Sequence, residues 1–478
     1  MASITSLGVG SGLDLESLIT NLLTAERAPT ESRLNLDEAK TQASISAYGS
    51  LKSTLVAFQD SLSDLKTTSF FSNRAATSGD STILTATSES TAALSSFNIA
   101  VTALAQESKV TTNGNFADAN ATVGAGTLTI GFVGGSSFDV SVASTDSLTV
   151  IRDAINNATD NIGVTASLIN ISATETELVI TSDNTGASNQ IDISVDDTGD
   201  GNDTDALGLS RFHFDGADPG NLLGFNQADN SRTAQDATIV IDNITVTNST
   251  NTFKDNIPGV TITAVGKSVD ASTTTALTIG TDTSSVKSKV TTFAASYNEL
   301  MIVLNTLTDV DAAAETRGIL TGDANVRLIE QQVRRITTGV VEGAASNLSS
   351  LAFLGFETNS NGTVTLDTDD LNSALAANFD DFVTLFTGTD GVATKLDDLL
   401  DTFLDAEGTV PTREDTLKKQ LSFIADERLD LERRLETIEA RFRSQFAALD
   451  ILISQLNNTG NFLLDQLAAN AKIINRDK

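Results

Sequence analysis

Residues 417–456 read LKKQLSFIADERLDLERRLETIEARFRSQFAALDILISQL, without a Pro or Gly. Alternate steps of four and three residues from Leu417 to Leu456 meet apolar side chains at ten of twelve positions, with Arg428 and Gln445 as the exceptions. An apolar stripe repeating every 3.5 residues is typical of a helix that pairs along its whole length. About forty residues at a rise of 1.5 Å make a helix of roughly 60 Å. The stretch therefore predicts a docking helix that binds another part of the chain or another subunit.

Composition excludes several classes of function. The 478-residue chain is long enough for about three or four domains, and it contains no Cys and one His. The absence of Cys excludes disulfides and thiolate metal sites. A single His leaves almost no residues for a His-based metal site or a Ser-His-Asp triad. The net charge of −33 disfavours nucleic acid and anionic membranes as partners. We expect no catalytic residue, no metal and no cofactor.

The sequence also shows no pattern typical of a membrane span or a Sec-type secretion signal. No stretch approaches eighteen uninterrupted apolar residues, so no membrane insertion is expected. Residues 1–27 lack a basic leading region and carry Asp14 and Glu16 instead, which argues against a Sec-type signal peptide. If the protein is extracellular, it leaves the cell by another route.

The amino-terminal part is predicted to be helical. Asp14 is a plausible N-cap for a helix whose apolar residues begin at Leu15, and Pro29 is expected to break or kink this helix. Steps of three and four from Tyr48 to Leu65 predict a second helix that ends near Thr68.

The amino-acid composition changes in the middle of the chain. Between about residues 73 and 282, Thr, Ser, Asn, Asp and Gly dominate, and short β-like runs alternate with turn signals. One amphipathic helix is predicted around residues 148–158. Residues 111–232 hold 17 acidic side chains against 3 Arg, which indicates an exposed, solvated β-rich domain.

Helical periodicity returns in the carboxy-terminal part. It starts near Val286, and residues 356–366 form a hairpin candidate with Asn361–Gly362 as its turn. A break is expected at Gly408–Pro411, before the long last helix.

The predicted fold is therefore an α+β multidomain arrangement, in which a terminal α-helical coiled-coil leg and a helical bundle enclose inserted β-rich head domains. The predicted domains are the leg (1–43 and 431–478), the bundle with a small hairpin (44–75 and 282–430), a β-rich head domain (76–110 and 233–281) and an inserted acidic head domain (111–232).

Several motifs are specific to one family. The run from Ser3 to Ile19, SITSLGVGSGLDLESLI, and its continuation to Pro29 resemble the start of the flagellar hook-associated protein 2 family, the filament-capping proteins. Residues 126–182 resemble a repeat of flagellins and cap proteins. Residues 234–261 resemble the segment in which the family's chain returns to its second head domain. Arg317–Asp323, Gly362–Asp367 and Leu385–Phe386 resemble its helical half. In the strand pair near Ile241-Asp242 the family usually has Asp-Gly, whereas this chain has Asn243; Asn tolerates left-handed geometry, so we expect the turn to survive.

The resemblance implies a role and partners. Such proteins are exported unfolded through the flagellum by the type III flagellar export machinery, with a dedicated export chaperone. They assemble as a homo-oligomeric ring at the extracellular distal tip, on the filament end, where they promote folding and insertion of flagellin. The expected docking residues for filament and neighbouring subunits are Leu7, Leu15, Leu18, Leu22, Leu435, Ile438, Phe442, Leu449, Leu452 and Leu456.

Other interpretations stay open. A tip adhesin could bind mucin or host glycans through its acidic head domains, and flagellin or another hook-associated protein is a third possibility. The acidic run 196–205 invites a calcium-loop interpretation, but an EF-hand needs a Glu where Leu207 stands, which favours a solvated loop. Gly8–Gly12 lacks phosphate-loop spacing and is interpreted as a hinge, and His213 as a packed domain residue.

Overall fold

The fold is described from a computed structural model, which covers residues 12, 14–112, 116–203, 207–218, 225–226, 232–311, 316–346 and 348–474. The chain divides into two compact units. Residues 1–70 and 284–478 make the helical unit, and residues 71–283 make the β-rich unit. The predicted α+β fold, with helices at both ends around an inserted β region, is confirmed; the finer four-domain division stays a prediction. Within the residues described here, no helix combines the length and apolar character that crossing a membrane requires.

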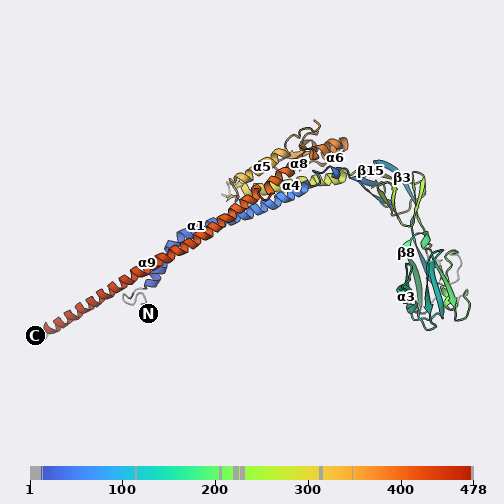
Figure 1. Ribbon diagram of the computed structural model, residues 1–478, viewed down its shortest axis with the longest axis horizontal. Helices are drawn as coiled ribbons and strands as arrows, with labels where there is room; N and C mark the ends of the chain where they lie inside the picture. Colours follow the sequence, from blue (N-terminus) through green and yellow to red (C-terminus); the bar gives the residue numbers. More distant parts are fainter. Residues whose placement is uncertain are drawn as a thin grey trace. The chain divides into compact units, whose positions relative to one another are not determined.

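The helical unit is built around two long helices. Figure 1 shows α1 and α9 side by side. The helices of this unit are α1 (Leu15–Leu62), α4 (Thr283–Thr308), α5 (Ala324–Thr337), α6 (Thr368–Ala377), α7 (Phe379–Thr387), α8 (Val392–Leu404) and α9 (Thr409–Ile474). Its short strands are β16 (Val310–Asp311), β17 (Thr316–Arg317), β18 (Phe356–Thr358) and β19 (Val364–Leu366), and η3 (Leu351–Leu354) is a 3₁₀ turn.

Aspartates cap the starts of α1 and α5. The Asp14 carboxylate accepts a hydrogen bond from the Ser17 amide at 3.0 Å, which confirms the predicted N-cap of α1. Asp323 caps α5 in the same way, through the Asn325 amide at 2.9 Å. Such a side chain satisfies an amide that has no partner inside the helix and complements the positive end of the helix dipole.

The expected break of α1 at Pro29 is wrong, and the alternative, a kink there, stays a prediction. One helix continues through Pro29 and ends at Leu62, so the predicted second helix is its later part and does not reach Thr68. A proline inside a helix costs about 3 kcal/mol, because it lacks an amide hydrogen and its ring crowds the preceding turn. Packing of α1 on α9, which fully buries Leu34, offsets this cost. Arg27 and Arg33, on either side of Pro29, add weak ion pairs with α9.

An aromatic cluster forms the centre of the helical unit. Phe293 on α4 is fully buried, and its ring centroid lies 5.7 Å from Phe58 of α1 and 5.9 Å from Phe356 of β18. Phe386 of α7 meets the same ring edge-on at 6.4 Å. One side chain thus joins four elements that lie far apart in the sequence.

Helix α4 also holds the β18–β19 hairpin with polar contacts. Asn298 forms two hydrogen bonds with the Val364 backbone, at 2.8 and 2.7 Å, as a neighbouring strand would. The Tyr297 hydroxyl donates to the Gly362 carbonyl at 3.0 Å. Burial raises the pKa of Tyr297 to about 12, so the hydroxyl keeps its proton at neutral pH.

The predicted hairpin is confirmed, but its turn differs. Thr358 pairs with Val364, and Asn359 closes the loop by donating to the Thr363 carbonyl at 2.8 Å. The loop proper is therefore Ser360-Asn361-Gly362, not the two-residue Asn361–Gly362 turn. Gly362 takes a φ of +83°, the left-handed conformation that a three-residue hairpin loop needs at its last position.

The β-rich unit contains two hydrophobic cores. The first lies between a five-stranded sheet and a three-stranded sheet. The five-stranded sheet has the order β1 (Arg74–Ser78), β15 (Thr275–Thr281), β3 (Ser95–Ala103), β11 (Ala237–Ile241) and β12 (Ile244–Asn248). The smaller sheet has the order β13 (Thr252–Ile257), β14 (Val260–Ala264) and β2 (Leu84–Ser88).

The Asp242–Asn243 turn survives as predicted. Ile241 pairs with Ile244, which leaves these two residues as the hairpin loop between β11 and β12. Their φ angles are +45° and +69°, as a type I′ turn requires at both positions. The Asp242 carboxylate also accepts the Asn98 amide at 2.9 Å, which attaches the turn to β3.

The second core is covered by two further sheets and one helix. One sheet has the order β10 (Phe225–Asn226), β4 (Glu107–Thr112), β8 (Glu175–Thr185) and β7 (Val164–Ser172), and the other has the order β6 (Ser137–Val142), β5 (Gly126–Phe132) and β9 (Ile191–Asp197). Helix α3 (Leu148–Asn157) confirms the helix predicted there, and it buries Leu148, Ile151 and Ile155 in this core.

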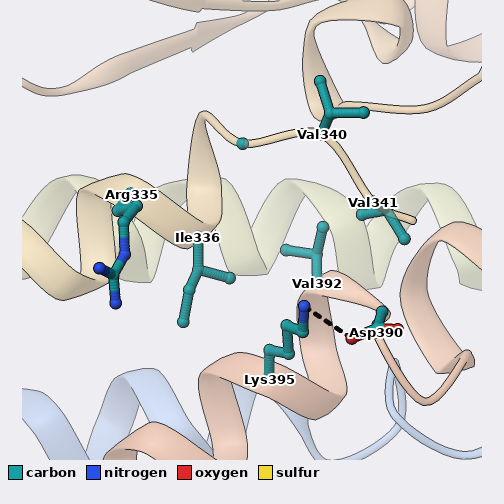
Figure 2. Close-up of a pocket in the computed structure, with 8 residues that line it drawn as sticks. Arg335, Ile336, Val340, Val341, Asp390, Val392 and Lys395 are labelled. Atoms are coloured by element: carbon teal, nitrogen blue, oxygen red, sulfur yellow. Dashed lines mark ion pairs between the residues drawn. The ribbon is translucent and has the colours of Figure 1, made fainter.

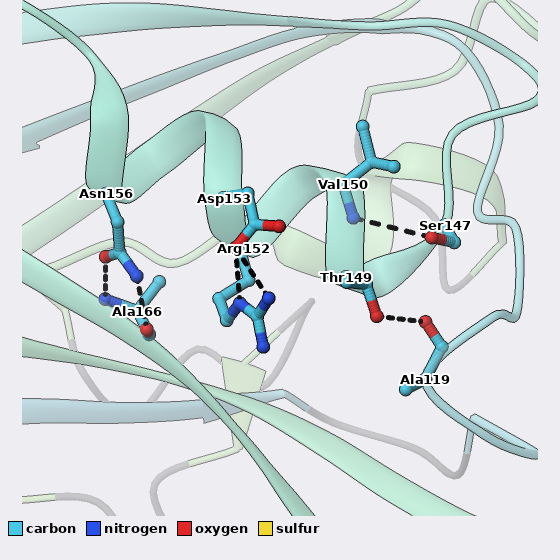
Figure 3. A network of polar contacts seen from close by, with 8 residues as sticks. All are labelled: Ala119, Ser147, Thr149, Val150, Arg152, Asp153, Asn156 and Ala166. Atoms are coloured by element: carbon cyan, nitrogen blue, oxygen red, sulfur yellow. Dashed lines mark hydrogen bonds and ion pairs between the residues drawn. The ribbon is translucent and has the colours of Figure 1, made fainter.

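Local polar contacts fix α3 at both ends (Figure 3). Ser147 accepts a hydrogen bond from the Val150 amide at 3.4 Å, and the Thr149 hydroxyl donates to the Ala119 carbonyl at 3.0 Å. Near the other end, Asn156 forms paired hydrogen bonds with the Ala166 backbone, at 2.8 and 2.7 Å. These contacts orient the apolar face of α3 toward the core.

Candidate functional site

The first candidate surface is the antiparallel pair of α1 and α9. Ion pairs cross between them, and the first four rise along α1 while they fall along α9. They join Glu16 to Arg443, Glu26 to Arg434 (3.0 Å), Arg27 to Glu432 (2.6 Å), Arg33 to Glu427 (2.9 Å) and Glu38 to Arg428 (2.5 Å). Exposed pairs are individually weak, but these first four agree on one antiparallel register for the two helices.

Spacing within α9 alone does not determine which of its charged residues pair with one another. Glu439 and Arg443 do pair within the helix, at 2.7 Å. Arg434, however, bonds to Glu26 of α1 instead of Asp430, which pairs with Arg433. Arg428, a polar interruption of the predicted stripe, crosses to Glu38 and Asn35. Sequence spacing does not reveal these ion-pair partners, because they depend on where α1 lies.

The predicted docking residues fall into three environments. Leu15 and Leu435 are buried in the seam between the helices, and Ile438 and Phe442 are half-buried there. Leu18 and Leu22 stand outside the seam and remain 44% and 38% exposed. Leu449, Leu452 and Leu456 are exposed on α9. Leu7 lies outside the residues that the structure describes, as do the predicted Gly8 and Gly10 of the hinge. The docking role of all these residues stays a prediction.

The pairing ends at Glu16 and Arg443. The pKa of Glu16 is lowered, chiefly by its hydrogen bond from Arg443, and that bond likewise raises the pKa of the guanidinium. Because the carboxyl pKa in the paired state lies below its ordinary value of 4.5, the pair is favoured above that pH and is lost as the pH falls through the lowered value. Beyond Arg443, α9 continues past the start of α1 (Figure 1).

This continuation, residues 447–469, is called the α9 end. Eight of its large apolar side chains are exposed, from 41% at Leu449 to 64% at Leu467. They are Leu449, Ile451, Leu452, Leu456, Phe462, Leu463, Leu464 and Leu467. Asp450 and Asp465 are its only charged residues. A contiguous exposed apolar surface of this kind marks an interaction site.

The acidic run 196–205 has a structural role in its described part. Asp197 is buried, and its carboxylate accepts backbone amides of Gly199 at 2.8 Å and Leu209 at 2.6 Å. Asp203 accepts the Asp197 amide at 2.7 Å. In the described part of the chain, no cluster of three His, Cys, Asp or Glu side chains is arranged to hold a metal ion; Asp205 lies outside it. His213 is half-buried between the buried Phe212 and Phe214.

A cleft of about 450 Å³ lies beside α5 and α8 (Figure 2). Its walls include Ile336, Val341 and Val392, and its Lys395 ammonium is paired with Asp390 at 2.7 Å. The one carboxylate in the lining is therefore already neutralised by a neighbour. We assign no chemistry to this cleft.

Comparison with known proteins gives a consistent relationship. Family models described as flagellar hook-associated protein 2 N-terminus and C-terminus match residues 11–108 and 234–458, and a flagellin hook IN motif matches residues 127–184. The A-type flagellar hook-associated protein 2 of Pseudomonas aeruginosa is 31% identical over 98% of both chains. The chain belongs to the flagellar hook-associated protein 2 family. The family's protein from Escherichia coli strain K12 is 33% identical, over 98% of this chain and 99% of that one.

Solved structures agree with membership of the hook-associated protein 2 family. The D1, D2 and D3 domains of the flagellar cap protein FliD from Escherichia coli align with a TM-score of 0.52 at 28% identity. They cover 78% of this chain and 99% of that one. The hook IN motif corresponds to β5, β6, α3, β7 and β8, which together surround most of the second core of the β-rich unit.

One substitution tests whether the Glu16–Arg443 ion pair holds the first turns of α1 against α9 in this member of the hook-associated protein 2 family. In Arg443→Gln, we expect the amides of residues 15–22 to exchange hydrogen faster, because the last ion pair between the helices is lost. Hydrogen-exchange mass spectrometry measures this directly. Arg433→Gln is the matched control, since Arg433 pairs with Asp430 of its own helix. Equal exchange in the two variants would show that the pair does not hold α1.

Proposed function

We propose that this chain is a flagellar filament cap that assembles as a homo-oligomeric ring on the filament end. There it holds exported flagellin while the flagellin folds and inserts, and so prevents its loss. The role is structural, without catalysis. Family membership supports the flagellar location, and the family relative from Escherichia coli is described as a flagellar cap protein.

The exposed α9 end is the observation that carries this proposal. A monomer that presents eight exposed large apolar side chains on one nearly uncharged stretch of helix needs a partner to cover them. The filament end and neighbouring subunits offer helical partners of the required kind, because seams of this type are filled by other helices. Leu449, Leu452 and Leu456 are the proposed contact residues, with Leu7, Leu18 and Leu22 on the amino-terminal side.

Export and assembly follow from the same proposal. The chain would leave the cell unfolded through the type III flagellar export machinery, delivered by a dedicated chaperone. The absence of Cys removes disulfide traps, and four Pro limit slow isomerisation during refolding outside the cell.

A complementation experiment tests the function. In flagellated cells that lack their own cap gene, the full-length chain is expected to reduce flagellin in the culture medium and to restore long filaments. Secreted flagellin is measured by immunoblot and filament length by electron microscopy. The chain's own secretion is measured in parallel, so that failed export is not mistaken for failed capping. Secreted chain with unchanged flagellin loss would contradict the proposal.

A further inference from the structure

A second apolar stripe runs along the exposed side of α1. Steps of four and three residues from Leu18 to Ala43 meet no charged side chain. The stripe consists of Leu18, Leu22, Ala25, Pro29, Ser32, Leu36, Ala39 and Ala43. At 3.6 residues per turn it lies roughly a third of a turn from the face that packs on α9. We call it the outer stripe.

All eight positions of the outer stripe are exposed, and Leu36 reaches 59%. The face toward α9, by contrast, buries Leu15, Ile19 and Leu34. Helix α1 therefore has two heptad-spaced faces, of which α9 of the same chain covers one. Pro29 belongs to the uncovered face, so its ring adds apolar surface to the outer stripe.

The α9 end matches the outer stripe in length and character. Leu449, Leu452, Leu456, Leu463 and Leu467 follow the same three-, four- and seven-residue spacing and are all exposed. From Leu449 to Leu467 and from Leu18 to Leu36 the chain advances equally, by about 27 Å in an α-helix. Neither surface would bury a charged stripe residue on contact, which removes the largest desolvation cost of association.

One chain cannot join its own two surfaces. Helix α9 is continuous to Ile474 and runs antiparallel to α1. The α9 end therefore lies beyond the first residue of α1, past the pair of Glu16 and Arg443. To reach the outer stripe of its own chain, α9 would have to break and fold back. A second copy needs no such change.

We propose that the α9 end of one copy packs on the outer stripe of α1 in the next copy. This inference rests on the proposed function in one respect, because it supplies the contact by which cap subunits would join. The two surfaces differ, so the contact is heterologous. Repeating it closes a ring only when the rotation between copies closes without an advance along its axis, and otherwise builds an open helical array. It assigns Leu18, Leu22 and Leu36 to a neighbouring subunit instead of the intrachain seam.

Cysteine cross-linking tests the contact, and the natural chain provides a clean background because it has no Cys. We would make full-length chains that carry Ser32→Cys together with one Cys at Leu452, Leu456, Thr459 or Leu463. After mild oxidation, at least one pair is expected to give a ladder of covalent dimers, trimers and larger species. Disulfides form only when the two Cα atoms come within about 7 Å.

The single-cysteine chains and the pattern of products separate the alternatives. A heterologous contact gives a ladder only when both positions carry Cys, whereas a symmetric contact gives dimers from one position. Fast-migrating monomers cross-linked within one chain would overturn the proposal, and so would the absence of any product across all four pairs. Cross-linking only to a flagellin that carries an introduced Cys, with no product between copies of this chain, would assign the surface to that partner and likewise overturn the proposal.

Self-association without cysteines gives a second measurement. Leu22→Glu and Leu36→Glu are each expected to weaken self-association about tenfold or more in analytical ultracentrifugation, since each removes one buried leucine from the contact. Leu429→Glu is the matched control, because Leu429 is similarly exposed, at 62%, on another face of α9. An equal effect of the control would contradict the assignment.

The two proposals fail separately. If the chain prevents flagellin loss in cells but yields no ladder, capping stands and the subunit contact is wrong. If the ladder forms but flagellin is still lost, the contact stands and the capping function is wrong.

Discussion

A chain that ends at Phe446 is expected to fold normally and to lose capping entirely. The truncation removes the α9 end with its eight exposed large apolar side chains. The Glu16–Arg443 pair and the buried Leu435 remain, so the α1–α9 pairing is kept. Circular dichroism should show an unchanged unfolding midpoint with less total helix, while flagellin loss in the complementation assay should return to that of cap-less cells.

A full-length variant separates loss of the surface from loss of chain length or export. Leu449→Glu, Leu452→Glu and Leu456→Glu together keep the helix and place three charges on its apolar surface, and this variant is expected to lose capping as the truncation does. Leu94→Glu, at a leucine 60% exposed in the β-rich unit, is the control and should cap normally. Long filaments formed with either the truncated chain or the triple variant would show that the α9 end is not the docking surface.

Replacing Phe293 by Ala is expected to destabilise the helical unit by about 3–5 kcal/mol, the usual cost of removing a buried aromatic ring and leaving a cavity. The fully buried ring contacts Phe58, Phe356 and Phe386, which come from three other elements. The change therefore weakens the packing of α1, α4, α7 and β18 together. Urea denaturation followed by far-ultraviolet circular dichroism, which is dominated by helices, measures the loss.

Ile302→Ala on the same helix is the control for Phe293. Ile302 is 49% exposed, so its truncation is expected to cost less than about 1 kcal/mol. A shift of similar size in both variants would mean that α4 is not anchored through its aromatic face. The β-rich unit has its own cores, so its amide exchange should be unchanged in both variants.

Local features were the most predictable from sequence. The Asp14 cap, the Asp242–Asn243 turn and the helix at 148–157 depend on residues that lie close together in the chain, and all three are confirmed. The expected break at Pro29 was wrong because its local penalty is real, but burial of the α1 face against α9, some four hundred positions away in the chain, outweighs it. The hairpin loop near Gly362 gained one residue through its closing pair between Asn359 and Thr363.

By itself, the sequence determined that α9 is a long helix with an apolar stripe, because a repeat of 3.5 residues allows little else. It also determined the family, through motifs spread from end to end. Only the tertiary structure decided where that stripe is covered. The ladder looks the same on both sides of Arg443, yet Leu435 is buried and Leu456 is exposed. The difference comes from where α1 begins in space, since periodicity shows which residues share a face but not how far a partner extends along it.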